Sequence, residues 1–356
     1  MMTVRTTAIA TTLVALAWSA QPVQAQGKQP NITIFATGGT IAGAAATGTQ
    51  SGYKSGAVGI DTMIAAVPGI EKLATIKGEQ IASVGSQDMS FAILLTVAKR
   101  INELAKSPGV DGFVITHGTD TLEESAFFLN LTVKTDKPVV MVGSMRPSTA
   151  VSADGPLNLY NGVAVAADPR AKGRGVLVVM NDWIHAAHSL TKTSTTAVQT
   201  FMSPVRGIVG VASYGKNDWY STPSWKHTTA SEFDISNVTA IPRVDIIFAD
   251  LDMAPELIDA SVASGAKGIV IAGVGNGNMN AASVTAAANA VKKGVPVVRS
   301  SRVATGLVGR NVELDDDKLG FIASDELNPQ KARILLGLAL LGKRTPAQLQ
   351  TLFTTY

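Results

Sequence analysis

Two side chains that could do chemistry, Thr119 and Asp120, stand next to each other in the segment DGFVITHGTDTLEE. The apolar run at 113–115 predicts a short buried strand before them. Thr121, followed three residues later by Glu124, is the pattern of a capping box at a helix start. A hydroxyl and a carboxylate would then lie at a strand-to-helix turn, where open α/β sheets bind ligands. The alternative is that both side chains only cap the helix.

A second threonine, Thr40, follows Gly38 and Gly39 after an apolar run at 32–36. A neutral hydroxyl is a weak nucleophile and needs a base or a proton path. Adjacent glycines let the backbone approach a ligand closely and offer N–H groups to a developing oxyanion. The pattern is therefore compatible with nucleophilic catalysis, and also with an ordinary tight turn.

A third polar cluster, Thr-Lys-Thr around Lys192, follows the strand predicted at 176–180. Burial readily shifts the pKa of a lysine, so a lysine beside a carboxylate and a hydroxyl could assist catalysis. Thr119, Asp120 and Lys192 would form a catalytic set if the sheet brings them together. Sequence spacing leaves open the alternative of a solvated surface lysine.

Two other motifs indicate different chemistry only weakly. His185 and His188 are three residues apart in a predicted loop without an H-E-x-x-H pattern, which is a weak hint of zinc. The glycines at 273, 275 and 277 miss the G-x-G-x-x-G spacing of a dinucleotide site. The chain has no cysteine, which excludes a thiol nucleophile and thiolate metal ligands.

Strands and helices alternate along the first part of the chain. The predicted strands are 32–36, 79–84, 113–115, 138–142 and 176–180, and the predicted helices are 61–66, 89–105, one ending near 131, and 156–167. Residues 85–88 are expected to cap the helix at 89–105, and the Gly-rich stretch 44–60 is expected to be a mobile active-site lid. This alternation predicts a parallel, doubly wound sheet.

Residues 203–242 lose this periodicity, and we place a linker at 221–242. A second α/β run follows, with strands predicted at 244–249, 268–272 and 295–299 and helices at 255–264, 280–292 and 329–342. The expected fold class is α/β, with two doubly wound domains and mainly parallel sheets. The larger N-terminal domain would span 26–220 and the smaller C-terminal domain 243–356.

The first 25 residues have the pattern of a secretory signal peptide. Arg5 precedes an apolar stretch at 8–17, and Val-Gln-Ala at 23–25 resembles a cleavage site. The apolar stretch is too short to span a bilayer, and no later run approaches ~20 apolar residues. We expect a soluble protein in the periplasm or outside the cell; a retained anchor is the alternative. A net charge of +3 without a Lys/Arg cluster argues against nucleic acid as a partner.

The chain resembles the bacterial type II L-asparaginases, the secreted family that also includes glutaminase-asparaginases, over roughly 28–356. Two family signatures carry the resemblance, IFATGGTIAG at 34–43 and GFVITHGTDT at 112–121. The other family segments are GSQD at 85–88, MRP at 145–147, SADGP at 152–156, GVGNGN at 273–278, RSSR at 299–302 and NP at 328–329.

The resemblance implies a role for each candidate residue. Thr40 matches the primary nucleophile, Tyr53 the lid tyrosine that helps to activate it, and Thr119, Asp120 and Lys192 a second triad. The implied substrate-binding residues are Gly39, Ser86, Gln87, Thr119, Asp120, Asn278 and Glu313. Ser86 and Gln87 would hold the α-carboxylate and Asp120 the α-amino group.

Family members are homotetramers built as dimers of intimate dimers, with sites at the dimer interface and no metal or organic cofactor. Asn278 and Glu313 match residues that a neighbouring subunit contributes. The expected activity is hydrolysis of L-asparagine to L-aspartate and ammonia through an acyl-enzyme on Thr40.

Substrate preference stays open because two cues conflict. Ser144 matches several glutaminase-asparaginases, whereas Asn278 matches the more asparagine-selective members. Three alternatives remain: a broad glutaminase-asparaginase, an exported amino-acid-binding protein without turnover, and a nucleotide-binding oxidoreductase, which the broken glycine spacing disfavours.

Overall fold

The computed structural model describes residues 28–356, so the predicted signal peptide lies outside the described residues. In the N-terminal part the strands are β1 (Asn31–Gly38), β2 (Thr75–Val84), β3 (Gly112–Thr116), β4 (Val139–Val142), β5 (Val176–Met180), β6 (Trp183–Ala186), β7 (Thr191–Lys192), β8 (Phe201–Met202), β9 (Gly210–Ser213) and β10 (Lys216–Trp219). The helices there are α1 (Ile60–Ala65), α2 (Phe91–Leu104), α3 (Leu122–Thr132) and α4 (Gly155–Ala167).

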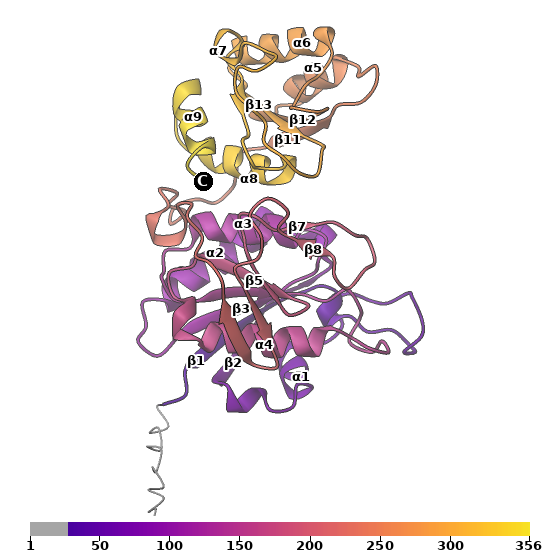
Figure 1. The fold of residues 1–356 in the computed structure, drawn as a ribbon, viewed down its shortest axis with the longest axis vertical. Helices are drawn as coiled ribbons and strands as arrows, with labels where there is room; N and C mark the ends of the chain where they lie inside the picture. The colour runs from indigo at the N-terminus through magenta and orange to yellow at the C-terminus, as the bar shows by residue number, and fades with distance from the viewer. Residues whose placement is uncertain (1–27) are drawn as a thin grey trace, which may run out of the picture.

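The C-terminal part repeats the alternation on a smaller scale. Its strands are β11 (Val244–Phe248), β12 (Gly268–Gly273), β13 (Val297–Ser301) and β14 (Ile322–Ala323), and its helices are α5 (Glu256–Ala263), α6 (Ala281–Lys292), α7 (Asp316–Leu319), α8 (Pro329–Ala339) and α9 (Pro346–Phe353). Figure 1 shows this part in orange and yellow above the larger N-terminal part. None of the helices within residues 28–356 has the length and apolar character of a membrane span.

The large sheet has the strand order β10-β9-β6-β5-β4-β3-β1-β2. Strands β2, β1, β3, β4 and β5 run parallel, and β6, β9 and β10 extend the sheet antiparallel. The order 2-1-3-4-5 reverses the direction of winding between β1 and β3, and ligands bind at the carboxyl ends of strands at such a switch point. Thr40 and Thr119 each lie just beyond one of these two strands.

Helices cover both faces of the large sheet, as the apolar sequence of its parallel strands requires. Side chains alternate along each strand. Phe35 and Phe113, whose rings stack with centroids 6.1 Å apart, belong to the core under α2 and α3. Ile34 and Val114 belong to the opposite core, under α1 and α4. The doubly wound α/β class predicted from the sequence is therefore confirmed.

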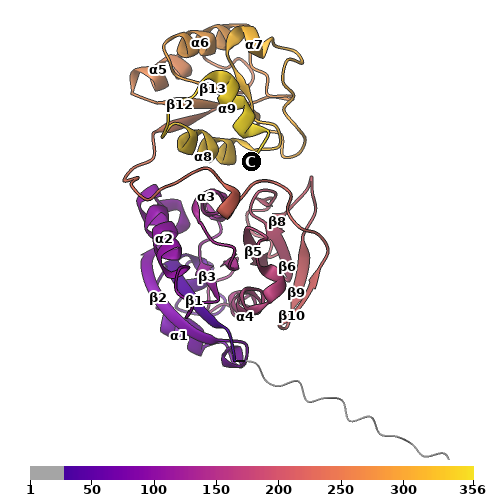
Figure 2. The same cartoon turned by 90° about the vertical axis from the view of Figure 1, so that its left-hand side faces the viewer.

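The small sheet is parallel in the order β11-β12-β13-β14. Helices α5 and α6 pack on one face, and α8 and α9 on the other. Helix α8 also packs on α3, so one apolar core continues from the large sheet into the small one. Figures 1 and 2 both show α8 between the two sheets, facing α3.

Three local expectations were wrong. Thr121 precedes α3, but its side chain makes no capping bond; its hydroxyl donates to the Ser86 carbonyl oxygen instead. Residues 86–88 form a 3₁₀ turn of their own, and Ser90 caps α2. His185, expected in a loop, lies in the strand β6. The exact domain boundaries stay predictions.

Candidate active site

The turns that follow β1, β2 and β3 meet at two glycines. A methyl group added to Gly39 would lie 2.2 Å from the Gly118 nitrogen, and one added to Gly118 would lie 2.6 Å from Ser86 Oγ. Real Cβ atoms do not approach other heavy atoms so closely, so both positions require glycine. This contact places the segment that contains Thr40 directly against the segment that contains Thr119.

The chain turns sharply at the end of β1, just before Thr40. Its pairing with β2 is irregular beyond Ala36, and Gly38 and Gly39 then adopt φ values of 105° and 81°. Thr40 begins a one-turn 3₁₀ helix at Thr40–Ala42 and is 8% exposed. Its Oγ1 lies 2.8 Å from Tyr53 Oη, so the predicted pair of Thr40 and Tyr53 is in hydrogen-bond contact.

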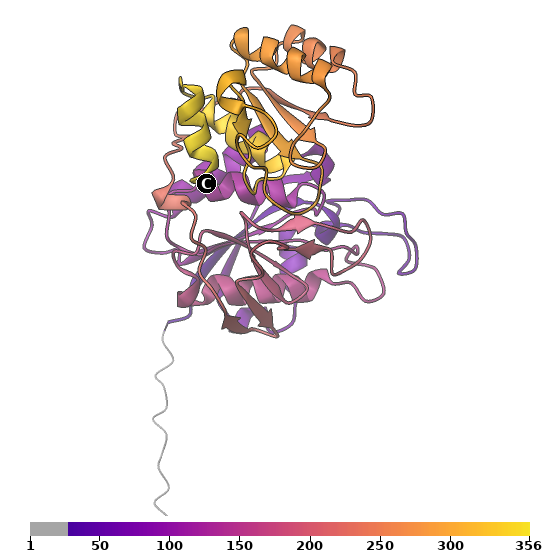
Figure 3. The same cartoon turned by 45° about the horizontal axis from the view of Figure 1, so that its top comes forward.

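The predicted lid, residues 44–60, is tied to the N-terminal domain near both of its ends, and its last residue begins α1. It is the indigo loop that projects sideways in Figure 3. Its two arms pair at Ala44 and Lys54, and the Gly56 nitrogen donates to the Gly39 carbonyl oxygen at 3.1 Å. The loop after β4 holds the opposite side, since Thr149 Oγ1 accepts from the Ala45 nitrogen at 2.9 Å. These contacts hold Tyr53 over Thr40.

Lys192 joins Thr119 and Asp120 from a different part of the chain. Its Nζ donates to Thr119 Oγ1 at 3.0 Å and to Asp120 Oδ1 at 2.6 Å. Thr119 is 5% exposed, whereas the Asp120 side chain is 60% exposed. The antiparallel pair β7 and β8 positions Lys192 opposite Phe201. The three residues proposed as a triad therefore meet, although 72 residues separate Lys192 from Asp120.

Ser86 fixes the turn that bears this triad. Its Oγ accepts a hydrogen bond from the Asp120 nitrogen at 3.0 Å, and its carbonyl oxygen accepts one from Thr121 Oγ1 at 2.8 Å. Ser86 is buried, whereas its neighbour Gln87 is exposed. A hydroxyl that accepts one backbone bond still has its hydrogen to donate, so Ser86 could also hold an anionic group.

The structure does not bring Gln87, Asn278 or Glu313 into this network. Asn278 lies in the turn after β12, where its backbone pairs with Val274, and Glu313 is exposed before α7. Within residues 28–356 none of these three side chains hydrogen-bonds to Thr40, Tyr53 or Lys192.

His117 is a supporting residue for which the sequence assigned no role. It is fully buried, its Nδ1 lies 2.6 Å from the Gly118 carbonyl oxygen, and burial lowers its pKa to about 4. The ring is therefore neutral at physiological pH, and its Nδ1–H donates to that carbonyl. In the sequence, the only indication that His117 supports this turn was its position between a predicted buried strand and a glycine.

The histidines behind the weak zinc hint serve other contacts. His185 Nδ1 lies 2.9 Å from Ser203 Oγ, and the His188 ring stacks on Trp225 with centroids 4.0 Å apart. In the part of the chain that the structure describes, no group of three or more potential metal-ligating side chains occurs.

Comparison with known proteins places the chain in a family. The family model "Asparaginase, N-terminal" matches residues 31–225, and the model "Glutaminase/Asparaginase C-terminal domain" matches residues 243–353. A Haemophilus influenzae protein named "Probable L-asparaginase periplasmic" is 54% identical over 92% of this chain and 93% of its own length. A Pseudomonas fluorescens protein named "Glutaminase-asparaginase" is 45% identical over 97% of this chain and 95% of its own length.

A solved structure gives the same result for the fold. The crystal structure of a protein from Campylobacter jejuni, titled "Probable Cytoplasmic L-asparaginase", superposes with a TM-score of 0.89 at 46% identity. The match covers 92% of this chain and all of that one. Both family models match in chain order, and relatives at this identity match nearly end to end. The chain belongs to the asparaginase family.

Proposed function

We propose that this protein hydrolyses L-asparagine to L-aspartate and ammonia, with Thr40 as the nucleophile. The observation that carries the proposal is the contact of Gly39 with Gly118. It sets two threonine-bearing turns against each other at the switch point of the sheet, and each threonine has its own polar partner. A binding protein without turnover has no need for two such hydroxyls or for Lys192.

The reaction proceeds in two steps that share one hydroxyl. Thr40 Oγ1 attacks the side-chain amide carbon and gives its proton to Tyr53 Oη, while the phenol passes its own proton on to the amide nitrogen. The C–N bond breaks, and the protonated amide nitrogen leaves as ammonia. Water then attacks the ester carbon, the bond to Thr40 Oγ1 breaks, and aspartate leaves as Thr40 regains its proton. Backbone N–H groups near Gly39 stabilise the oxyanion of each step.

The second group of residues recognises the amino-acid part of the substrate. The Asp120 carboxylate pairs with the α-ammonium group, and Ser86 with Gln87 receives the α-carboxylate. The exposed Asp120 side chain is free to accept a further ammonium, because Lys192 contacts only its Oδ1. Lys192 and Thr119 complete the proton path beside the scissile amide.

Ammonia release from L-asparagine tests the proposal directly. We expect turnover by the parent protein and a loss of roughly 10³-fold or more in kcat for Thr40→Ala and for Thr119→Ala. Both variants should keep the parent thermal unfolding midpoint to within a few degrees, because each loses only a small side chain. A chelator should leave the rate unchanged.

Two outcomes would redirect the proposal. Tight binding of asparagine without ammonia would favour the exported binding protein, and a metal requirement would contradict the threonine mechanism. Full activity in Thr40→Ala would mean that another residue is the nucleophile.

Hydrolysis of L-glutamine is the alternative within the same class, since one relative is named a glutaminase-asparaginase. One methylene separates the two substrates, and a pocket discriminates by only about 1–3 kcal/mol for such a difference. The Ser144 hydroxyl is buried and donates to the Arg146 carbonyl oxygen at 2.7 Å, so it is already engaged within its own loop. We therefore expect asparagine to be preferred; a higher kcat/KM for glutamine would reverse that order.

Self-association as a homotetramer would complete the site with Asn278 and Glu313 from a neighbouring subunit. The placement of these residues outside the network supports this, as do the exposed apolar side chains of the C-terminal domain. Leu251 is 97% exposed and Phe248 is 58% exposed. Light scattering should give four times the chain mass, and an active monomer would contradict the shared site.

We also propose export to the periplasm. The predicted signal peptide and the word "periplasmic" in the name of the Haemophilus influenzae relative support this. Fractionation of cells should recover the protein outside the cytoplasm, with a mature N-terminus near Gln26. A cytoplasmic protein that retains Met1 would contradict it.

A further inference from the structure

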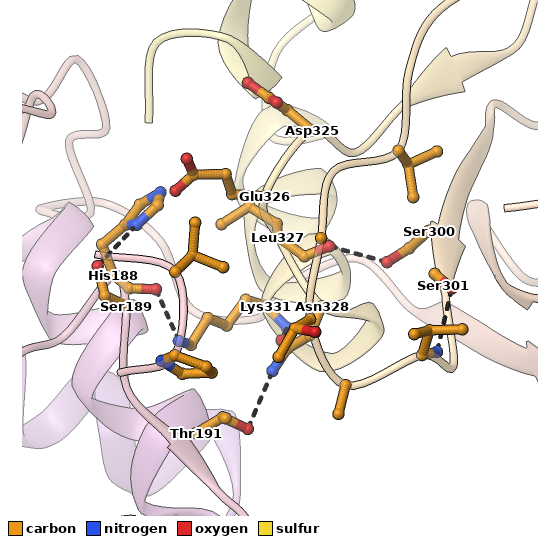
Figure 4. Close-up of a pocket in the computed structure, with 17 residues that line it drawn as sticks. His188, Ser189, Thr191, Ser300, Ser301, Asp325, Glu326, Leu327, Asn328 and Lys331 are labelled. Atoms are coloured by element: carbon orange, nitrogen blue, oxygen red, sulfur yellow. Dashed lines mark hydrogen bonds between the residues drawn. The ribbon is translucent and has the colours of Figure 1, made fainter. Parts of the chain in front are cut away.

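A polar cluster at the start of α8, with two buried charged members, lies between the two domains, next to the segment that carries Lys192. It consists of Glu123, Asn328, Gln330 and Lys331. Figure 4 shows Asn328 and Lys331 reaching across from the C-terminal domain toward Thr191 and His188. Neither the hydrophobic contact of α3 with α8 nor the proposed reaction explains why charged groups are buried here.

Lys331 is the centre of this cluster. Its side chain is 3% exposed, and its Nζ donates to the carbonyl oxygens of His188, at 2.7 Å, and of Leu190. Burial lowers its pKa to about 8. An ammonium group is expensive to bury, and an apolar side chain would fill the same space more favourably. The bonds that it makes therefore point to a role in fixing the two carbonyls.

Asn328 and Gln330 connect the same helix start to α3. Asn328 Nδ2 lies 3.3 Å from Glu123 Oε2 and 3.5 Å from Thr191 Oγ1, and Gln330 Nε2 donates to Glu123 Oε1 at 2.7 Å. Asn328 Oδ1 accepts from the Lys331 nitrogen at 3.1 Å and so caps α8. Glu123 is buried as well, at 5% exposure.

The cluster therefore contacts the chain next to both members of the ion pair Lys192–Asp120. Leu190 and Thr191 immediately precede Lys192, and Glu123 lies in the first turn of α3, three residues after Asp120. A displacement of β7 relative to α3 would change the separation of Lys192 Nζ from Thr119 Oγ1. Misplacement of a reacting group by about 1 Å can reduce a rate about 100-fold.

We propose that Lys331 and Asn328 are positioning residues, which hold the chain before Lys192 in place so that its amine reaches Thr119 and Asp120. The inference rests on the proposed function of Lys192. It assigns the C-terminal domain a task within its own chain, in addition to any residue that it lends to a neighbouring subunit.

A double-mutant cycle on the purified full chain tests this. We measure kcat and KM for asparagine in the parent, Lys331→Met, Lys192→Met and the double variant. Lys331→Met should lower kcat by about 30- to 100-fold with KM changed less than about threefold. The double variant should be no slower than Lys192→Met within about twofold, because Lys331 acts through Lys192. A further loss equal to that of the single variant would overturn the proposal.

A second variant keeps the test decisive if Lys331→Met does not fold. Asn328→Ser retains an acceptor for the α8 cap but removes the amide nitrogen that reaches Glu123 and Thr191. It should lower kcat severalfold, again without a further loss in the Lys192→Met background. The matched control is Lys99→Met, because Lys99 Nζ donates to the Val238 carbonyl oxygen at 2.7 Å, away from the site. Equal losses in Lys99→Met and Asn328→Ser would overturn the proposal.

A readout without substrate separates this inference from the proposed function. In brief acetylation followed by peptide mass spectrometry, Lys192 should react slowly in the parent, since its side chain is 17% exposed and engaged by Asp120. Lys331→Met should increase its labelling severalfold, and Lys99→Met should not. Unchanged labelling in Lys331→Met would overturn the inference even if asparagine is hydrolysed. Failure of the parent to hydrolyse asparagine would overturn only the proposed function.

Discussion

Tyr53 and Thr40 form the contact on which the proposed chemistry depends at the scale of single residues. Their hydroxyls are 2.8 Å apart, and the two residues are 13 positions apart in the chain. Gly43 makes the approach feasible, because a methyl group there would lie 2.8 Å from Tyr53 Cδ2. The lid therefore places the phenol of Tyr53 against Thr40. A side chain at position 43 would not fit beside the tyrosine ring.

Replacement of Tyr53 by phenylalanine tests this contact. The ring would keep its place beside Gly43, while Thr40 would lose its hydrogen-bond partner. We expect kcat for asparagine to fall by roughly 10- to 1,000-fold with little change in KM, because the phenol acts on the reacting hydroxyl and not on the substrate's ends. Steady-state kinetics measure both quantities. Tyr220→Phe, at a 58% exposed tyrosine, is the matched control; equal kcat in both variants would rule out the role.

At the scale of elements, the strand ends were predictable and the contacts between them were not. The apolar runs that became β1, β3 and β5 are fully buried and bounded by glycine or polar residues, so the pattern located them closely. Thr121 shows the limit, since its capping pattern is local but its hydroxyl bonds to Ser86, which is 35 residues away. Sequence spacing likewise did not show that β7 carries Lys192 to Thr119.

The turn after β1 gives the element-scale prediction. Gly39→Ala would force a methyl group against the Gly118 backbone at a φ of 81°, so the two turns must separate. We expect a loss of roughly 2–3 kcal/mol in the free energy of unfolding and activity below about 1% of the parent. Gly59→Ala is the matched control, because Gly59 has open space around its Cβ position and a negative φ of −73°. Chemical denaturation and ammonia release measure the two effects. Parent-like activity in Gly39→Ala would contradict the proposed contact between turns.

At the scale of the whole molecule, buried neutral histidines tie stability to pH. Burial lowers the pKa of His117 and His185 to about 4 and that of His188 to about 3. Below the ordinary value of 6.5 the unfolded chain binds protons that the folded chain does not. The free energy of unfolding must therefore fall as pH drops from 6.5 toward 4. Glu124, whose pKa burial raises to about 7, opposes this trend in part.

His188→Phe should weaken that dependence on pH. Phenylalanine keeps a flat ring against Trp225, on which the His188 ring stacks at an angle of 17°, but it takes up no proton. With a folded pKa of about 3, His188 accounts for roughly 3 kcal/mol of the stability lost between pH 6.5 and pH 4. Urea unfolding of parent and variant at several pH values measures this effect. As the pH falls from 6.5 to 4, the free energy of unfolding of the variant should rise relative to that of the parent by that amount. The pair compared at pH 7.5 serves as the control, because His188 is neutral there in both states of the parent. Parallel curves over the whole range would mean that the imidazole takes up its proton equally well in the folded and unfolded chain, contrary to its burial between the domains.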